Sequence, residues 1–206
     1  MYTALNATSR TVQGVLEREL RADTNLAVYF DPTAAGAMVV SLNTPQEMQV
    51  RDIEGVSAWL YRVVRDDQRL NSPPERVSET QVRRAPLPVR LHYLITPIIS
   101  STATVYGPEL EQIILGKILE VFHDHPNQRG SALEGDFVGT DVELHVHLEP
   151  LSLEEITRVW DALDRSYQLS VSYEVTVVEI ESALQPRILT PVKEVLPERG
   201  IIMGSE

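Results

Sequence analysis

Three segments of the chain alternate apolar and polar residues with a period of two, which is the pattern of β-strands. They are residues 87–96 (LPVRLHYLIT), 142–149 (VELHVHLE) and 169–180 (LSVSYEVTVVEI). A fourth segment, residues 55–64 (GVSAWLYRVV), has aromatic and β-branched side chains on both faces, as a strand in the middle of a sheet does. Because successive side chains of a strand point to opposite faces, these segments predict a sheet with a buried face.

Apolar residues at helical spacing predict two helices. One precedes all of these strands in the sequence, and the other lies between the segments 87–96 and 142–149. In residues 3–22 one apolar stripe is predicted, formed by Leu5, Val12, Val15, Leu16 and Leu20. In the segment 106–126, Pro108 lies near the start of a predicted helix and Pro126 lies beyond its end. Apolar side chains occupy most of the circumference of this second helix, so we expect it to be central.

A third predicted helix begins with a capping box. Ser152 is followed three residues later by Glu155. The Ser152 hydroxyl can therefore accept a hydrogen bond from the backbone amide of Glu155, and the Glu155 carboxylate can accept one from the backbone amide of Ser152. Leu151 and Ile156 occupy the positions of a hydrophobic staple. The start of this helix is therefore defined by its local sequence.

The order of these elements indicates the fold class. Shorter β-like runs at residues 25–30 (NLAVYF) and 37–42 (AMVVSL) add two predicted strands between the first helix and residues 55–64. The resulting order is helix, several strands, helix, strand, helix, strand. This order predicts an α+β fold, with a mixed or antiparallel sheet flanked by about three helices.

Composition and charge limit the possible partners. The chain has 206 residues, 43% of them hydrophobic, which is enough for one domain with an appendage. Its net charge of -12 predicts repulsion from phosphates, so we expect neither nucleic acid nor a membrane as a partner. The absence of cysteine excludes a disulfide, a thiolate metal site and a thiol nucleophile. Without a secretion signal or a membrane-length apolar run, synthesis and assembly are expected in the cytoplasm, with release only as part of a larger particle.

The last segment combines the apolar residues of a core with prolines that prevent regular structure. Pro186, Pro191 and Pro197 lack the backbone donor that a helix or a central strand requires, so the sequence predicts a domain at residues 1–182 and an extended arm at residues 183–206. An extended arm can bind another chain by strand pairing and by filling pockets with alternate side chains. The residues expected to bind a partner are Ile188, Leu189, Val192, Val195, Leu196, Ile201 and Ile202.

The strongest candidate for chemistry is the strand segment ELHVHLE. His145 and His147 alternate along it and therefore point to the same face, with Glu143 and Glu149 beside them. Such a face can bind a metal ion. The alternative is a polar strand face that makes cross-strand ion pairs, and we favour it because the sequence places no third ligand.

Other candidate sites have weaker support. His123 and His125 lie two residues apart at a helix end, where they do not share a helix face and where the macrodipole already favours histidine. The chain has no nucleophile elbow, no P-loop, no dinucleotide-binding glycine motif and no H-E-x-x-H motif. We therefore expect no catalytic residue, no metal and no cofactor.

Five sequence motifs carry a family resemblance. They are GVSAWLYRVV, RRAPLPVRLHYLITP, LGKILEVFHDHP, VELHVHLEPLSLEEITRVWDAL and YQLSVSYEVTVVEIES. In this order and spacing, which cover nearly the whole chain, they resemble a family of cap, or tube terminator, proteins of phage-tail-like contractile injection systems.

The resemblance implies a structural protein rather than an enzyme. It implies a homohexameric ring, related to the tail terminators of contractile phages, that closes the inner tube at the end farthest from the baseplate. The implied partners are the inner tube protein and the sheath protein, with the C-terminal arms reaching the last sheath ring. Two alternatives remain: a small metal-dependent hydrolase that uses the His145/His147 strand, and a baseplate or tail-completion protein.

Overall fold

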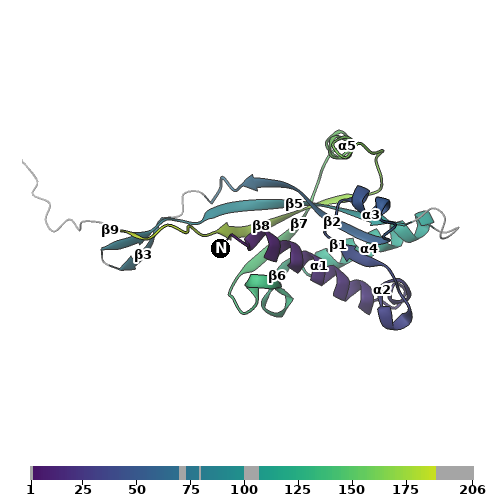
Figure 1. Ribbon diagram of the computed structural model, residues 1–206, viewed down its shortest axis with the longest axis horizontal. Helices are drawn as coiled ribbons and strands as arrows, with labels where there is room; N and C mark the ends of the chain where they lie inside the picture. Colours follow the sequence, from purple (N-terminus) through teal and green to yellow (C-terminus); the bar gives the residue numbers. More distant parts are fainter. Residues whose placement is uncertain (1, 70–72, 79, 100–106, 189–206) are drawn as a thin grey trace, which may run out of the picture.

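The computed structural model describes residues 2–69, 73–78, 80–99 and 107–188, and a six-stranded sheet lies at its centre (Figure 1). From one edge to the other, the strands are β1 (Val39–Ser41), β2 (Gly55–Arg65), β5 (Leu87–Ile98), β8 (Val171–Ile180), β7 (Glu143–Glu149) and β6 (Asn127–Arg129). β1 pairs with β2 in parallel, and every other neighbouring pair in this sheet is antiparallel. The predicted α+β class with a mixed sheet is confirmed.

Two long helices cover one face of this sheet, which we call the inner face (Figure 1). Helix α1 (Ala4–Ala22) corresponds to the predicted helix at residues 3–22. Its apolar stripe joins the main core with Leu91 and Tyr93 of β5. The Ser9 hydroxyl lies 2.8 Å from the Tyr93 hydroxyl and so links α1 to the sheet by a hydrogen bond.

Helix α4 (Gly107–Asp124) covers the inner face beside α1. Ile114 and Ile118 are buried in the main core, whereas Ile113 on the other side of the helix is 54% exposed. The expectation of a central helix is therefore wrong: α4 is a covering helix that presents one side to solvent. None of the helices within the described ranges has both the length and the apolar character needed to cross a lipid bilayer.

Helix α5 (Leu153–Asp161) lies over the opposite, outer face of the sheet (Figure 1). The predicted capping box is present, because the side chains of Ser152 and Glu155 each accept a hydrogen bond from the backbone amide of the other residue. Trp160 is 1% exposed and packs with Leu94 of β5 in a second, smaller core. With both faces covered, β5 is buried on both sides along most of its length, where the sequence predicted one buried face.

The segment predicted as a strand at residues 25–30 is a short helix, α2 (Ala27–Phe30). Asp23 accepts hydrogen bonds from the amides of Asn25 and Leu26, and this turn starts the helix. Leu26 and Phe30 lie four residues apart, so one helical turn directs both side chains into the core. The run predicted at 37–42 contains β1, as expected.

A further short helix, α3 (Pro45–Val50), was not predicted although the sequence signals it. Thr44 and Glu47 form a second capping box, and Pro45 occupies the first turn, where its missing amide hydrogen costs nothing. The buried side chain of Met48 anchors the helix beside β2 and β5.

A second, three-stranded sheet lies beyond one end of the long strands (Figure 1). Its strands are β3 (Glu75–Ser78), β4 (Gln81–Arg83) and β9 (Arg187–Ile188), in that order. β9 belongs to the segment predicted as an extended arm, and it pairs antiparallel with β4. The start of the arm is therefore attached to the β3–β4 hairpin.

Candidate functional site

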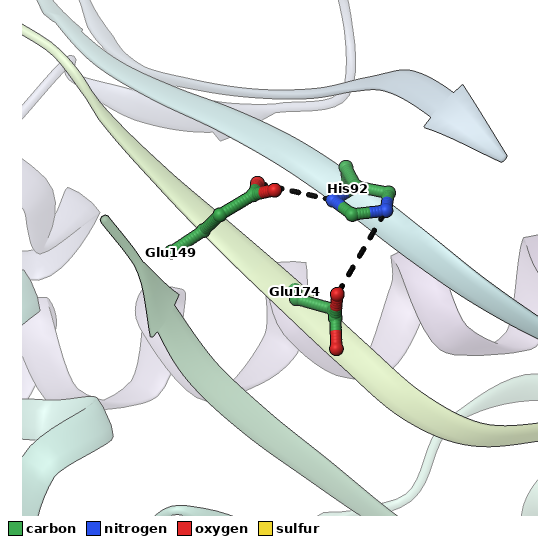
Figure 2. A group of neighbouring side chains, drawn as sticks. All are labelled: His92, Glu149 and Glu174. Carbon is green, nitrogen blue, oxygen red and sulfur yellow. Dashed lines mark hydrogen bonds and ion pairs between the residues drawn. The ribbon is translucent and has the colours of Figure 1, made fainter. Parts of the chain in front are cut away.

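Three polar side chains from three adjacent strands meet on the outer face of the large sheet (Figure 2). His92 comes from β5, Glu174 from β8 and Glu149 from β7. Glu149 Oε2 lies 3.0 Å from Nδ1 of His92, and Glu174 Oε2 lies 3.9 Å from Nε2. The imidazole is thus held between two carboxylates, one at each ring nitrogen.

This cluster is largely removed from solvent. His92 is only 4% exposed, and both carboxylates are mostly buried. A carboxylate can only accept a hydrogen bond, so His92 Nδ1 carries the proton that it shares with Glu149. This hydrogen bond fixes the orientation of the ring.

Glu149 accepts two more hydrogen bonds on the same oxygen. The Ser172 hydroxyl donates at 2.6 Å and the Tyr61 hydroxyl at 3.2 Å. Burial by itself raises the pKa of Glu149, but the hydrogen bonds from Ser172, His92 and Tyr61 outweigh it, and the pKa of this carboxyl lies below its ordinary value. The charged form of Glu149 is therefore the one that the fold stabilises.

An arginine connects this cluster to a third carboxylate, the buried Asp66. Arg90 donates to Asp66 at 2.8 Å and lies 3.7 Å from Oε1 of Glu174. The hydrogen bond from Arg90 lowers the pKa of Asp66 despite its burial. A cavity of about 310 Å³ adjoins these groups and is lined also by Arg62 and Arg65. Cationic and anionic side chains therefore lie together around this cavity.

The cluster does not have the arrangement of a hydrolytic triad. The Ser172 hydroxyl donates to Glu149 and makes no hydrogen bond with His92 among the described contacts, so no base activates it. One ring nitrogen and one oxygen from each carboxylate lie within 4.8 Å of one another. This donor set can instead hold a small cation.

The predicted histidine pair lies on the same outer face. His145 and His147 of β7 have nearly parallel rings, with centroids 6.2 Å apart, and His145 Nδ1 lies 2.6 Å from Asn127 Oδ1. His147 also lines an apolar groove of about 720 Å³ with His123, whereas His125 is not part of that groove. The structure therefore brings His147 together with His145 and with His123, whereas His125 lies outside both groups.

The sequence reasoning missed His92 and Glu174. Both occupy polar positions of segments that were correctly predicted as strands, so their alternation was the available signal. Their proximity follows from strand register, because His92 and Glu174 are direct cross-strand partners. A single sequence does not give that register.

The arm residues predicted to bind a partner lie mostly outside the described part of the chain. Ile188 is described, pairs with Gln81 in the second sheet and is 79% exposed. The remaining predicted residues are Leu189, Val192, Val195, Leu196, Ile201 and Ile202, all outside the described residues. The partner-binding role and the division at residues 182 and 183 stay predictions.

Fold and site together define an α+β domain with a mixed sheet, a projecting small sheet and a buried polar network on its outer face. The chain belongs to the family of the Pvc16 N-terminal domain, whose model matches residues 7–194. This membership, together with the two solved structures described next, confirms the resemblance that the sequence motifs indicated.

Two solved structures share the fold. The PVC sheath/tube terminator of an extracellular contractile injection system, in its extended state, has a TM-score of 0.59 and 18% identity, over 99% of this chain and 65% of that chain. The tube-terminating cap of the anti-feeding prophage has a TM-score of 0.57 and 20% identity, over 96% of this chain and 61% of that chain. The chain thus spans less than two thirds of the length of either protein. The comparison with curated proteins gives no match.

Proposed function

We propose that this protein is a structural cap that terminates the inner tube and the sheath of a contractile injection system. It acts as a homohexameric ring at the end of the tube farthest from the baseplate, and its C-terminal arms bind the last sheath ring. The observation that carries this proposal is the family match over residues 7–194, supported by a fold shared along almost the whole chain with two terminator proteins.

The second sheet supports the part of the proposal that concerns the arm. All four residues of β3 are exposed, and within the described residues β3 has a neighbour on one side only, which leaves an edge for strand addition. Ile188 in β9 and Leu184, which precedes β9, are exposed apolar residues. An apolar arm that starts from a projecting sheet is suited to binding along another protein.

A ring of identical subunits requires two different surfaces that fit each other and close after a fixed number of copies. Such a ring at the tube end blocks further addition of tube and sheath subunits by occupying the sites where they would bind. This action needs specific association and no chemical turnover. The inner tube protein, the sheath protein and further copies of this chain are the proposed partners, and neither nucleic acid nor a membrane is required.

The polar network favours this structural role over the small hydrolase. Ser172 is bonded to a carboxylate rather than to a base, so it is not activated as a nucleophile. The baseplate or tail-completion alternative differs in position along the particle, so locating the protein in assembled particles decides between them.

Two experiments test the proposal. Electron micrographs of particles from a strain that lacks the gene should show tubes and sheaths of irregular length, and a labelled copy of the protein should lie at one end, away from the baseplate. Native mass spectrometry of the purified protein at high concentration, or with tube fragments added, should show hexamers. A label at the baseplate, or a stable dimer on tube-bearing particles, would contradict the proposal.

A further inference from the structure

We propose that His92, Glu174 and His147 bind one zinc-type divalent cation on the outer face of the sheet, and that Glu149 holds His92 in position for it. This proposal departs from the sequence expectation of no metal site. It is independent of the capping role, because it concerns the folded subunit alone.

The two nitrogens of His92 have different surroundings (Figure 2). Nδ1 donates to Glu149 at 3.0 Å, which leaves Nε2 as the nitrogen with an available lone pair. The nearest carboxylate oxygen to Nε2 is Glu174 Oε2 at 3.9 Å, which is too long for a hydrogen bond. Two atoms that bind the same tetrahedral zinc ion through bonds of about 2.0–2.1 Å lie about 3.3–3.4 Å apart, so Nε2 and Oε2 would have to approach each other by about 0.5 Å to share one.

The hydrogen bonds of His92 leave Nε2 open to an ion. His92 is 4% exposed, and the described contacts give Nε2 no hydrogen-bond partner. The lone pair of Nε2 is therefore available to an ion placed between this nitrogen and Glu174. A histidine that binds a metal through one nitrogen while donating from the other to a carboxylate is a frequent arrangement in zinc proteins. Glu149 is placed to serve as that carboxylate.

Strand register supplies the third ligand. Glu174 is the direct cross-strand partner of His92 on β5 and also of His147 on β7. Directly opposed residues of antiparallel strands point to the same face, with Cβ atoms about 4.5–5.5 Å apart. The three side chains therefore form one row across β5, β8 and β7. The exposed ring of His147 can turn from its stack on His145 towards Glu174.

Arginines as well as carboxylates surround the proposed ion: Arg62 is the cross-strand partner of His92, and Arg65, which is paired with Asp67, and Arg90 line the same cavity. Arg90 approaches Glu174 through Oε1, at 3.7 Å, so Oε2 remains directed at His92. The second guanidinium nitrogen of Arg90 is engaged by Asp66. Two imidazoles and one carboxylate are nitrogen and oxygen donors of the kind that zinc prefers, whereas magnesium and calcium favour sites made of oxygen alone. A bound ion would join three strands beside α5.

The test uses zinc and the purified full chain without a polyhistidine tag. Zinc titrated against a chromophoric chelator should bind with a stoichiometry of one ion per chain and raise the melting temperature. Cobalt in place of zinc should give the visible absorption of a four-coordinate ion with nitrogen and oxygen ligands. Circular dichroism of each variant confirms that it is folded.

Substitutions distinguish this site from scattered surface histidines. Glu174→Gln and His92→Gln should each weaken zinc binding at least tenfold, and His147→Gln should do the same. The matched control is His145→Gln, which removes a histidine from the same strand and face but outside the row; it should leave the affinity unchanged. Glu149→Gln should keep the stoichiometry and weaken binding about 10–100-fold, as expected of a positioning residue.

Three results would overturn the proposal. The first is the absence of stoichiometric zinc binding to the wild-type chain. The second is unchanged affinity in folded Glu174→Gln protein, which is informative even if His92→Gln fails to fold. The third is an equal loss of affinity in His145→Gln, which would indicate non-specific binding by exposed histidines. Any of these would leave the cluster as a network of ion pairs alone.

Discussion

Replacing Glu149 with glutamine tests how much the polar network on the outer face stabilises the fold. Glutamine keeps the size of the side chain but removes the negative charge of the carboxylate. One oxygen of that carboxylate accepts hydrogen bonds from Ser172, His92 and Tyr61. Hydrogen bonds to charged groups contribute about 1.5–3 kcal/mol each, against about 0.5–1.5 kcal/mol for neutral ones. Because glutamine still accepts part of this network and solvent reaches Glu149 in part, we expect a loss of about 2–3 kcal/mol in the free energy of unfolding at pH 7.

The effect should depend on pH in a defined direction. The pKa of Glu149 is lower in the folded chain than its ordinary value of 4.5, because the three hydrogen bonds outweigh the effect of burial. A carboxyl with a lowered pKa stabilises the fold fully above its unfolded pKa, and this contribution is lost as the pH falls through the folded pKa. The difference in the free energy of unfolding between wild type and variant should therefore be constant from about pH 6 to 8 and become smaller below about pH 4.5.

Urea unfolding followed by circular dichroism, at several pH values and with EDTA present, measures this difference. Glu154→Gln is the matched control, since Glu154 forms an exposed ion pair with Arg158 on α5 that should contribute less than about 0.5 kcal/mol. A loss below about 0.5 kcal/mol for Glu149→Gln, comparable to that control, would refute the reasoning. So would a difference that persists unchanged at pH 3.

Three further predictions concern the arm, the smaller core and the ring. Deleting residues 184–206 should leave a folded domain, because the described part of that segment contacts the rest through a two-residue strand in which Ile188 is 79% exposed. Loss of the cooperative unfolding transition in a thermal melt followed by circular dichroism would show that the arm belongs to the core. Particles carrying the deletion, or Ile188→Asp with Ile201→Asp, should show naked tubes or frayed sheath ends in micrographs, whereas normal sheaths would exclude sheath binding. Trp160→Ala should lower the free energy of unfolding by about 3–5 kcal/mol, because Trp160 fills the core under α5 and donates to Ser170; a loss under 1 kcal/mol in urea unfolding would contradict this. Cross-linking on tube fragments should stop at six subunits, and longer ladders would argue against a closed ring.

Local sequence was sufficient for the elements with strong local signals. Period-two alternation located β2, β5, β7 and β8, and the Ser152/Glu155 pair located the start of α5. These succeeded because side-chain alternation and capping depend on residues close together in the chain. The capping box at Thr44 and Glu47 carried the same kind of signal for α3 and could have been used.

Elements that depend on distant contacts were not predictable in the same way. The β-like run at 25–30 became α2 because the core beneath it accepts Leu26 and Phe30 from one helical turn. The exposed side of α4 likewise follows from its position on one face of the sheet, although its composition resembles that of a central helix. In both segments tertiary packing outweighed local preference.

The candidate site likewise has one part that the sequence predicts and one part that depends on the tertiary structure. The sequence by itself determined that His92, Glu149 and Glu174 each lie at polar positions of strands, and its motifs determined the family. Only the tertiary structure decided that these side chains meet, because alternation gives the face of a strand but not its register. Shifts of register between β2 and β5 and between β5 and β8 set which residues are opposed, and a slip of one residue would send each side chain to the other face.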